Sequence, residues 1–376
     1  SANTTADNNT AIGSESLKVN TTGARVTAIG KQSLWSNTTA SNNTAVGYQA
    51  AYANTTGANN VAVGKQALLS NTDGLHHTAV GTLALAQNTT GTYNTALGSF
   101  ALQNTTTGYR NVGLGYGALR QNTVGFYNIG IGFGAGGLTT TGDYNVSVGG
   151  NALIDNTTGG SNVAIGYGSL NSNTTASFNT AVGINALEAN TTGDNNTAVG
   201  SQALDNNTTG DDNTAVGFQA AYTQSGSAHS NTAIGRKSQY STTTANSNTS
   251  VGFNSLFYTT TGSDNAAVGN NALQANTTGT GNVAIGRQAL TENTTASDNV
   301  AIGYQTQFKS TTGYQNVCVG KGAGGEIRAG HNNVFIGFRA GNYNTDTTSG
   351  NGNTLVGNYL RATGNGGGSQ YAMGLG

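Results

Sequence analysis

One 17-residue unit decides the fold of this chain, and residues 43–59 show it as Asn43-Thr44-Ala45-Val46-Gly47-Tyr48-Gln49-Ala50-Ala51-Tyr52-Ala53-Asn54-Thr55-Thr56-Gly57-Ala58-Asn59. The glycine of its Ala-Val-Gly step, termed the marker glycine, recurs every 17 residues from Gly13 to Gly217. After one 18-residue interval it recurs from Gly235 to Gly337, and a 20-residue interval leads to Gly357, which makes 21 repeats. Such a short fixed period predicts a solenoid whose repeats each contact only their neighbours.

The composition narrows the class of protein. The 376 residues would suffice for two or three globular domains, but the unbroken period favours one array. Only 8% of the residues are charged and the net charge is −1, which argues against binding to nucleic acid or to anionic membranes. The single cysteine excludes an intramolecular disulfide framework, and no apolar run approaches the roughly 20 residues needed to span a bilayer. The start at Ser1, without a methionine or a signal-like segment, is consistent with a processed chain or a piece of a longer fibre.

The apolar positions show that this Asn-, Thr- and Gly-rich chain is folded. The residue before the marker glycine is Val, Ile or Leu in all 21 repeats, from Ile12 to Val356. A second apolar position, four residues after the marker glycine, is Leu in 13 repeats. We expect two short strands in each coil, one carrying each position, with the glycine at the bend between them. The predicted core residues are Val46, Val63, Val182, Val199, Leu68, Leu102 and Leu204.

Two further positions are restricted to small side chains. The residue before each Val or Ile is Ala, Gly, Ser or Cys in 19 repeats, and the third residue after the marker glycine is Ala or Ser in 19. A purely solvated face would accept long polar residues there, so these stripes predict close packing against another chain. The predicted interchain seam comprises Ala45, Ala50, Ala181 and Ala186.

Asparagine occupies the fourth position before the marker glycine in 19 of 21 repeats, with Val26 and His77 as the exceptions. Amides stacked one coil apart can hydrogen-bond along the axis, so the pattern predicts an Asn ladder. Its representative members are Asn43, Asn60, Asn94 and Asn196. A polar groove for a ligand is the alternative interpretation of the same row.

The Asn-Thr-Thr step in each turn has two interpretations. Asparagine and the following glycine favour tight turns, and each Asn-Thr-Thr is also a formal acceptor for N-glycosylation. The candidate glycan sites are Asn20, Asn37, Asn54, Asn88, Asn156 and Asn190. Stacked rows of Thr55 and Thr56 equivalents would also offer the regular hydroxyl array of an ice-binding surface.

No group of residues outside the repeat pattern has the composition or spacing of a catalytic or metal-binding site. The histidines have no zinc-site spacing, and Asp143, Asp194 and Asp211 lie in turns without the Gly-Gly-x-Gly-x-Asp run of calcium-binding β-rolls. Glycine-rich stretches such as residues 113–117 are in phase with the repeat and precede no helix, so they are not phosphate loops. We therefore expect no enzyme activity, no metal and no cofactor. Aromatic residues after some marker glycines, such as Tyr48 and Phe133, could stack on a cell-surface glycan.

The regularity divides the chain into three segments. Residues 1–303 carry regular 17-residue repeats, residues 304–361 carry degenerate repeats or a cap, and residues 362–376 read as a Gly-rich tail or linker. The first repeat, which begins at Asn3, has no cap and should therefore stack on another segment or molecule.

The repeated Asn-Thr-Ala-Val-Gly-x-x-Ala-Leu, as in residues 94–102 and 196–204, resembles two families. These are the head repeats of trimeric autotransporter adhesins and the β-solenoid shafts of phage tail fibres. The resemblance covers the chain to about Gly357, although these repeats are longer than the adhesin type and no coiled-coil stalk or membrane anchor is visible. It implies a left-handed parallel β-roll, commonly trimeric, that projects from a cell or virion and binds surfaces.

The sequence therefore predicts an all-β parallel solenoid of about 21 coils that acts as an extracellular structural fibre or adhesin shaft. It would be a homo-oligomer, would present a polar Asn/Thr surface for attachment, and would lie on a cell or virion surface. Two alternatives stay open: a filament that polymerises end to end, with or without sugars, and an ice-binding solenoid.

Overall fold

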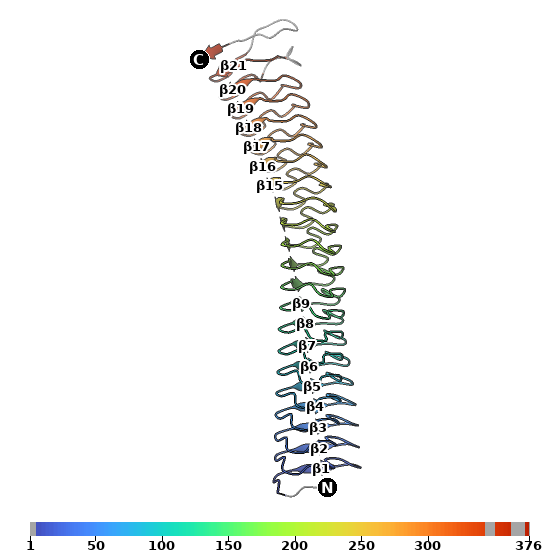
Figure 1. The fold of residues 1–376 in the computed structure, drawn as a ribbon. Helices are drawn as coiled ribbons and strands as arrows, with labels where there is room; N and C mark the ends of the chain where they lie inside the picture. The colour runs from blue at the N-terminus through green and yellow to red at the C-terminus, as the bar shows by residue number, and fades with distance from the viewer. Residues whose placement is uncertain (1–4, 343–349, 362–372, 376) are drawn as a thin grey trace. The chain divides into compact units, whose positions relative to one another are not determined.

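The computed structural model describes residues 5–342, 350–361 and 373–375. Within these residues the regular secondary structure consists of 22 three-residue strands, and no helix is present that could cross a membrane. The chain forms two compact units, Ser1–Thr192 and Gly193–Gly376. Each unit is a parallel β-solenoid with one strand per coil and a 17-residue repeat (Figure 1).

The strands of the first unit are β1 (Thr10–Ile12), β2 (Thr27–Ile29), β3 (Thr44–Val46), β4 (Val61–Val63), β5 (Thr78–Val80), β6 (Thr95–Leu97), β7 (Val112–Leu114), β8 (Ile129–Ile131), β9 (Val146–Val148), β10 (Val163–Ile165) and β11 (Thr180–Val182). Those of the second unit are β12 (Thr197–Val199), β13 (Thr214–Val216), β14 (Thr232–Ile234), β15 (Thr249–Val251), β16 (Ala266–Val268), β17 (Val283–Ile285), β18 (Val300–Ile302), β19 (Val317–Val319), β20 (Val334–Ile336), β21 (Thr354–Val356) and β22 (Met373–Leu375).

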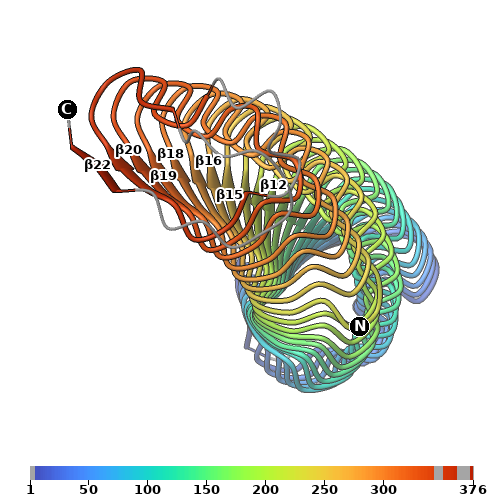
Figure 2. The same ribbon diagram turned by 90° about the horizontal axis from the view of Figure 1, so that it is seen from above.

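Within each unit, successive strands pair in parallel and in register. Thr44 pairs with Val61 and Val46 with Val63, for example, so that equivalent repeat positions form straight columns along the solenoid. The end-on view in Figure 2 shows the strands following one another on one side of the coils. The register survives the 18-residue interval, where Thr214 pairs with Thr232. Every position of the repeat therefore becomes a continuous row of like side chains.

The predicted second strand is absent, and this expectation was wrong. The segment that carries the Leu position is a turn with left-handed residues, as in Gln66 (φ 56°) and Leu68 (φ 54°). Its backbone still hydrogen-bonds to the neighbouring coils: Leu68 N donates to Ala84 O at 2.9 Å and Gln66 N to Tyr48 O at 2.8 Å. Coil-to-coil hydrogen bonds on both sides explain why a chain without proline suits this fold.

The core lies on the other face of the strands from the one predicted. Leu68, Leu102 and Leu204 are fully buried, as expected. Val46, Val63 and Val182 are only partly buried and Val199 is exposed, because the first and third residues of these strands point away from the coil. The middle residue points inward instead. Assigning these valines to the core was therefore wrong.

The small-residue stripes are the interior of the coil, not an interchain seam. Ala45, Ala50, Ala181 and Ala186 are all fully buried within their own unit. The reason is the narrowness of the coil: at Gly130, a Cβ atom would lie 2.8 Å from Leu119 Cγ, which comes from the opposite side of the interior. The restriction to small side chains does indicate close packing, as predicted. The side chains that pack against these positions, however, come from the opposite side of the same coil interior and not from another chain.

The marker glycines bring the backbones of adjacent coils into close contact. Gly47 has φ +137°, and a Cβ atom added there would lie 2.5 Å from the carbonyl oxygen of Gly64. Both the backbone conformation and the lack of space exclude other residues at this position. The glycine thus closes each three-residue strand, as its place in the repeat predicts.

The degenerate repeats keep the same coil by exchanging large and small side chains. Phe335 and Leu355 are buried at the middle position of β20 and β21, where β1–β19 have Ala, Gly, Ser or Cys. Opposite Phe335, Gly341 replaces the usual leucine, and a Cβ atom there would lie 2.5 Å from the Phe335 ring. The interior therefore stays filled. Of the predicted tail, residues 362–372 and 376 lie outside the described residues, and β22 pairs in parallel with β21.

Candidate interaction surfaces

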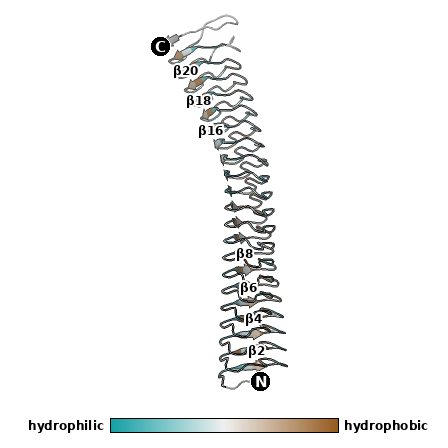
Figure 3. Ribbon diagram, in the orientation of Figure 1, coloured by the Kyte–Doolittle hydropathy of each residue, from teal (hydrophilic) through white to brown (hydrophobic). Residues whose placement is uncertain are grey.

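The outward face of the strands carries a run of partly exposed apolar side chains in each unit. We term it the outer face: the first and third residues of each strand from β1 to β21, which are Thr, Val, Ala, Ile or Leu throughout. Its third-position residues include Ile12, which is 58% exposed, and Leu97, which is 50% exposed. Hydrophobic colouring gathers on the strand arrows in Figure 3. The aligned register turns these residues into two parallel rows.

The outer face is free of charge and large enough to be significant. None of the chain's 29 charged residues (14 Lys and Arg, 15 Asp and Glu) occupies it in β1–β21. A three-residue strand covers roughly 50 Å² at ordinary strand dimensions, so the strands of each unit present on the order of 500 Å². Apolar patches of about this size are often functional, and larger ones mark interaction sites.

The predicted Asn ladder is present beside the strands. Asn60 N donates to Asn43 Oδ1 at 2.9 Å, and Asn60 Nδ2 donates to Gly74 O at 2.9 Å. Asn94 accepts from Asn111 N and donates to Gly108 O in the same way, and Asn196 donates to Gly210 O. The four amides are fully or almost fully buried and serve backbone groups, so this row is structural and forms no ligand groove.

The candidate glycan sites form a second buried ladder, which the sequence analysis missed. Asn37 Nδ2 donates both to Asn20 Oδ1 at 2.8 Å and to Ala40 O at 3.0 Å, and Asn54 continues the row through Asn37 Oδ1 at 3.0 Å. Asn20, Asn37, Asn54, Asn88, Asn156 and Asn190 are all fully buried. An N-linked sugar on Nδ2 would remove these hydrogen bonds and could not fit inside the coil. The glycosylation hypothesis for these six residues is therefore wrong for the folded chain.

The second ladder is interrupted at Thr105, and this interruption predicts a stabilising substitution. Thr105 stands where Asn88 and Asn122 stand in adjacent coils, and Asn88 Oδ1 consequently has no hydrogen-bond partner. We expect Thr105→Asn to donate to Asn88 Oδ1 and to raise the free energy of unfolding by about 1 kcal/mol. Chemical denaturation of both proteins measures this gain. Thr105→Val, which cannot donate, is the matched control, and an equal gain in both variants would contradict the explanation.

His77 replaces asparagine in the first ladder and makes the stability of its coil pH-dependent. The buried ring accepts from Asn94 N at 3.2 Å and contacts Gly91 O through Nε2 at 2.7 Å, which assigns the proton to Nε2. Burial is the main cause that lowers the pKa of His77 from 6.5 to about 4. The neutral ring is thus favoured in the folded state, and the contribution to stability is complete above pH 6.5 and decreases as the pH falls towards 4.

We expect this loss to amount to about 3 kcal/mol between pH 7.5 and pH 4. Urea denaturation at several pH values measures it, with hydrogen exchange of residues 70–95 as the local readout. His77→Asn, the residue of 19 other coils, should remove most of the dependence in this range. An unchanged pH profile in this variant would contradict the assignment to His77.

The threonine rows of the turn are less suited to ice than the sequence suggested. Thr55 Oγ1 donates to Thr72 O at 2.9 Å, and Thr38 Oγ1 donates to Thr55 O at 3.2 Å, so the first hydroxyl of each pair serves the neighbouring coil. The second threonine, such as Thr56, is exposed. Only one of the two rows therefore keeps its hydroxyls directed to solvent.

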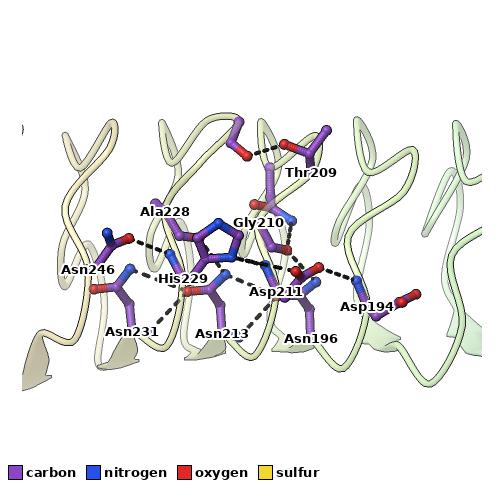
Figure 4. A network of polar contacts seen from close by, with 12 residues as sticks. Asp194, Asn196, Thr209, Gly210, Asp211, Asn213, Ala228, His229, Asn231 and Asn246 are labelled. Carbon is purple, nitrogen blue, oxygen red and sulfur yellow. Dashed lines mark hydrogen bonds and ion pairs between the residues drawn. The ribbon is translucent and has the colours of Figure 1, made fainter.

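The turn aspartates cap backbone groups. Asp211 Oδ1 accepts from Asp194 N at 2.8 Å, His229 Nδ1 accepts from Asp211 N at 2.9 Å, and Asn246 Oδ1 accepts from His229 N at 2.8 Å (Figure 4). His229 Nδ1 also lies 3.6 Å from Asp211 Oδ2, but a ring that accepts an N–H at Nδ1 is neutral. In the part of the chain that the structure describes, no group of three His, Cys, Asp or Glu residues is placed to hold a metal ion.

Aromatic side chains form rows of their own. Tyr116 and Phe133, which follow marker glycines, stack at 5.5 Å between ring centroids, whereas Tyr48, at the same repeat position, has no ring contact among the described residues. A longer group lies in the first unit, where Tyr109 and Phe126 stack at 5.0 Å and Tyr127 and Tyr144 at 5.4 Å. The sequence analysis did not single out this second group, although the 17-residue phase of its members would have revealed it.

Comparison with known proteins adds no family to this description. No protein-family model matches the chain, and no curated protein sequence matches it.

Proposed function

We propose that this chain is the structural shaft of an extracellular fibre or adhesin, and that copies of it associate through their outer faces as a homotrimer of left-handed solenoids. The observation that carries this proposal is the outer face: two uncharged rows of Thr, Val, Ala, Ile and Leu that run along the strands β1–β21 of the two units. The resemblance of the repeats to trimeric adhesin heads and tail-fibre shafts supports the oligomeric state and the handedness.

A second copy of the same chain fits this surface better than another partner does. The rows repeat at one coil per step, roughly 4.8 Å, and only a surface with the same repeat can match them over many coils. The absence of charge from the face removes any repulsion between identical copies. The two units together present on the order of 1,000 Å² per copy, which lies within the range of stable interfaces.

In such an assembly, the turns that remain exposed on the outside would bind the target surface. These turns carry the exposed threonines, such as Thr56 and Thr90, and the exposed aromatic rows. A long, uncharged, repetitive surface of this kind suits binding to a cell surface. We propose extracellular display on a cell or virion surface, and a structural role without catalysis.

The oligomeric mass in solution tests the proposal. Light scattering of the intact protein should give three chains per particle, and the double variant Ile131→Lys/Ile165→Lys should give single chains with an unchanged circular dichroism spectrum. Thr141→Lys/Thr175→Lys, which places the same charges on exposed turn positions of two coils, is the matched control and should remain trimeric. A monomeric wild-type protein would overturn the proposal.

The same measurements address the two alternatives. Long filaments that persist in the double variant would favour end-to-end polymerisation. A monomer that produces thermal hysteresis in freezing solutions would favour ice binding, for which the flat outer face offers a more regular array than the Thr55 and Thr56 rows.

A further inference from the structure

One column of residues in the first unit departs from the rest of the solenoid. It comprises the residue immediately before the first Asn ladder in each coil, which has left-handed backbone angles throughout. Asn8, Asn42 and Asn59 occupy it in three of the early coils. Over the next seven coils the occupants are His76, Tyr93, Arg110, Tyr127, Tyr144, Ser161 and Phe178. We term these seven residues the aromatic column.

The large side chains in this column are held in a conformation that disfavours them. Tyr93 has φ 58°, Tyr144 has φ 57° and Phe178 has φ 60°. Asparagine and glycine adopt this region at low cost, whereas a bulky residue there is an outlier. The fold does not need an aromatic residue at this position, since Asn42 and Asn59 fill it in other coils.

Stacking covers the faces of most rings in the column. His76 and Tyr93 lie 4.9 Å apart with an interplanar angle of 5°, and Tyr127 and Tyr144 lie 5.4 Å apart at 7°. The Arg110 guanidinium lies between Tyr93 and Tyr127, 5.7 Å and 5.2 Å from the two ring centroids. The flat faces of these side chains are therefore covered by their neighbours in the column. Only the edges of the rings in the middle of the column contact solvent.

The column is interrupted by one coil at Ser161. Tyr144 stacks on Tyr127 on one side only, and it is 55% exposed, compared with 37% for Tyr127. Phe178 is 64% exposed and has no ring contact among the described residues. Two coil steps separate Tyr144 from Phe178, a distance of roughly 10 Å. Elsewhere in the column a ring or the planar Arg110 guanidinium lies at every coil step, so this interval is the length that one additional ring would occupy.

Small residues form the floor of this interval. Gly160 and Ser161 stand between the two aromatic residues, and Gly160 N donates to Ser177 Oγ at 3.0 Å while Ser161 N donates to Asp143 O at 2.9 Å. At Gly160 a Cβ atom would lie only 3.1 Å from Asp143 O. The backbone here is therefore fixed, and the side chains above it are short.

We propose that this interval binds the pyranose ring of an uncharged saccharide between the side chains of Tyr144 and Phe178. The apolar C–H faces of a pyranose stack on aromatic rings, and the Ser161 hydroxyl can exchange hydrogen bonds with its hydroxyl groups. A nucleotide is a poorer fit, because the cation of this column, Arg110, lies two coils from Tyr144 and is stacked between Tyr93 and Tyr127. The inference deepens the proposed attachment role and rests on it for the source of the saccharide.

The test uses the intact protein and defined sugars. Saturation-transfer NMR would be measured with methyl glycosides of glucose, galactose, mannose and N-acetylglucosamine, and with their linear oligosaccharides. At least one probe should bind at millimolar concentration. Tyr144→Ala should weaken that binding about tenfold or more, because one stacking partner is lost. Ser161→Tyr should abolish binding, because it places a ring in the interval as other coils of the column do.

Ser247→Tyr is the matched control, since Ser247 occupies the same repeat position in the second unit with φ 56° and has Ser230 and Asp264 beside it in the column. This variant should bind like the wild type. A wild-type protein that binds none of the probes, or Ser161→Tyr binding unchanged, would overturn the inference. Light scattering of the same samples keeps the two proposals distinguishable, because none of these substitutions touches the outer face and the mass should not change.

Discussion

Gly149→Ala is expected to unfold the coils on either side of it. Gly149 follows β9 with φ +130°, and a Cβ atom there would lie 2.6 Å from Gly166 O, a backbone atom of the next coil. Neither the backbone conformation nor the position of the neighbouring coil can relax, because every other coil repeats the same contact. We expect a loss of about 3 kcal/mol or more of local stability.

Hydrogen exchange followed by mass spectrometry measures this loss at the affected coils. Protection should decrease in residues 130–170 and remain near the wild-type level in distant coils, since a solenoid couples mainly nearest neighbours. Gly117→Asn is the matched control: Gly117 has φ +64°, a region that asparagine tolerates, and a Cβ atom there meets nothing within 4 Å. Equal loss of protection in both variants would show that the steric argument is wrong.

Ala164→Asp and Ile165→Asp should have opposite consequences although the residues are adjacent in β10. Ala164 is fully buried and faces the coil interior, whereas Ile165 is 40% exposed on the outer face. A carboxylate at position 164 would be buried without a partner, and we expect a loss of about 4 kcal/mol or more. The same carboxylate at position 165 would be solvated in a single chain.

Thermal unfolding and light scattering together separate the two effects. Ala164→Asp should lower the unfolding temperature and expose β9–β11 to proteolysis. Ile165→Asp should leave the single chain folded and reduce its association with other copies. If Ile165→Asp unfolds the coil as severely as Ala164→Asp does, the assignment of the two faces of the strand is incorrect.

The period of the sequence was sufficient to predict the solenoid, because a column of identical residues at fixed spacing has few other structural explanations. It also predicted the buried leucines, the ladder at Asn43 and Asn60, and the bend at each marker glycine. These features depend only on the phase of the repeat. They need no knowledge of which way the strand faces.

The direction of the strand could not be inferred from hydrophobicity. In Thr44-Ala45-Val46 the larger apolar residue is normally the buried one, but here Ala45 is buried and Val46 is only partly buried. The deciding factor is the width of the coil, which leaves room for alanine opposite leucine but not for valine. The pair Phe335 and Gly341 does carry this information, since a larger residue at the middle strand position accompanies a smaller one at the Leu position across the interior.

The burial of Asn20 and Asn54 could not be predicted from the Asn-Thr-Thr motif alone. An Asn-Thr-Thr motif describes a short stretch of chain, whereas the bonds that occupy these amides come from the coil 17 residues away. The spacing of Asn-Thr-Thr at the repeat period was the available signal, and it indicates a ladder as strongly as the row at Asn43 does.

The coil between β13 and β14 has a practical consequence for protein engineering. Its additional residue is absorbed in the turn around Gly226, where Gly226 has φ +42° and a Cβ atom would meet nothing closer than 3.9 Å, while Thr214 and Thr232 still pair in register. Foreign peptides could be inserted at such a turn without moving the strands. Conversely, whole coils could be added or deleted in multiples of 17 residues, so the length of the solenoid could be set in steps of one repeat.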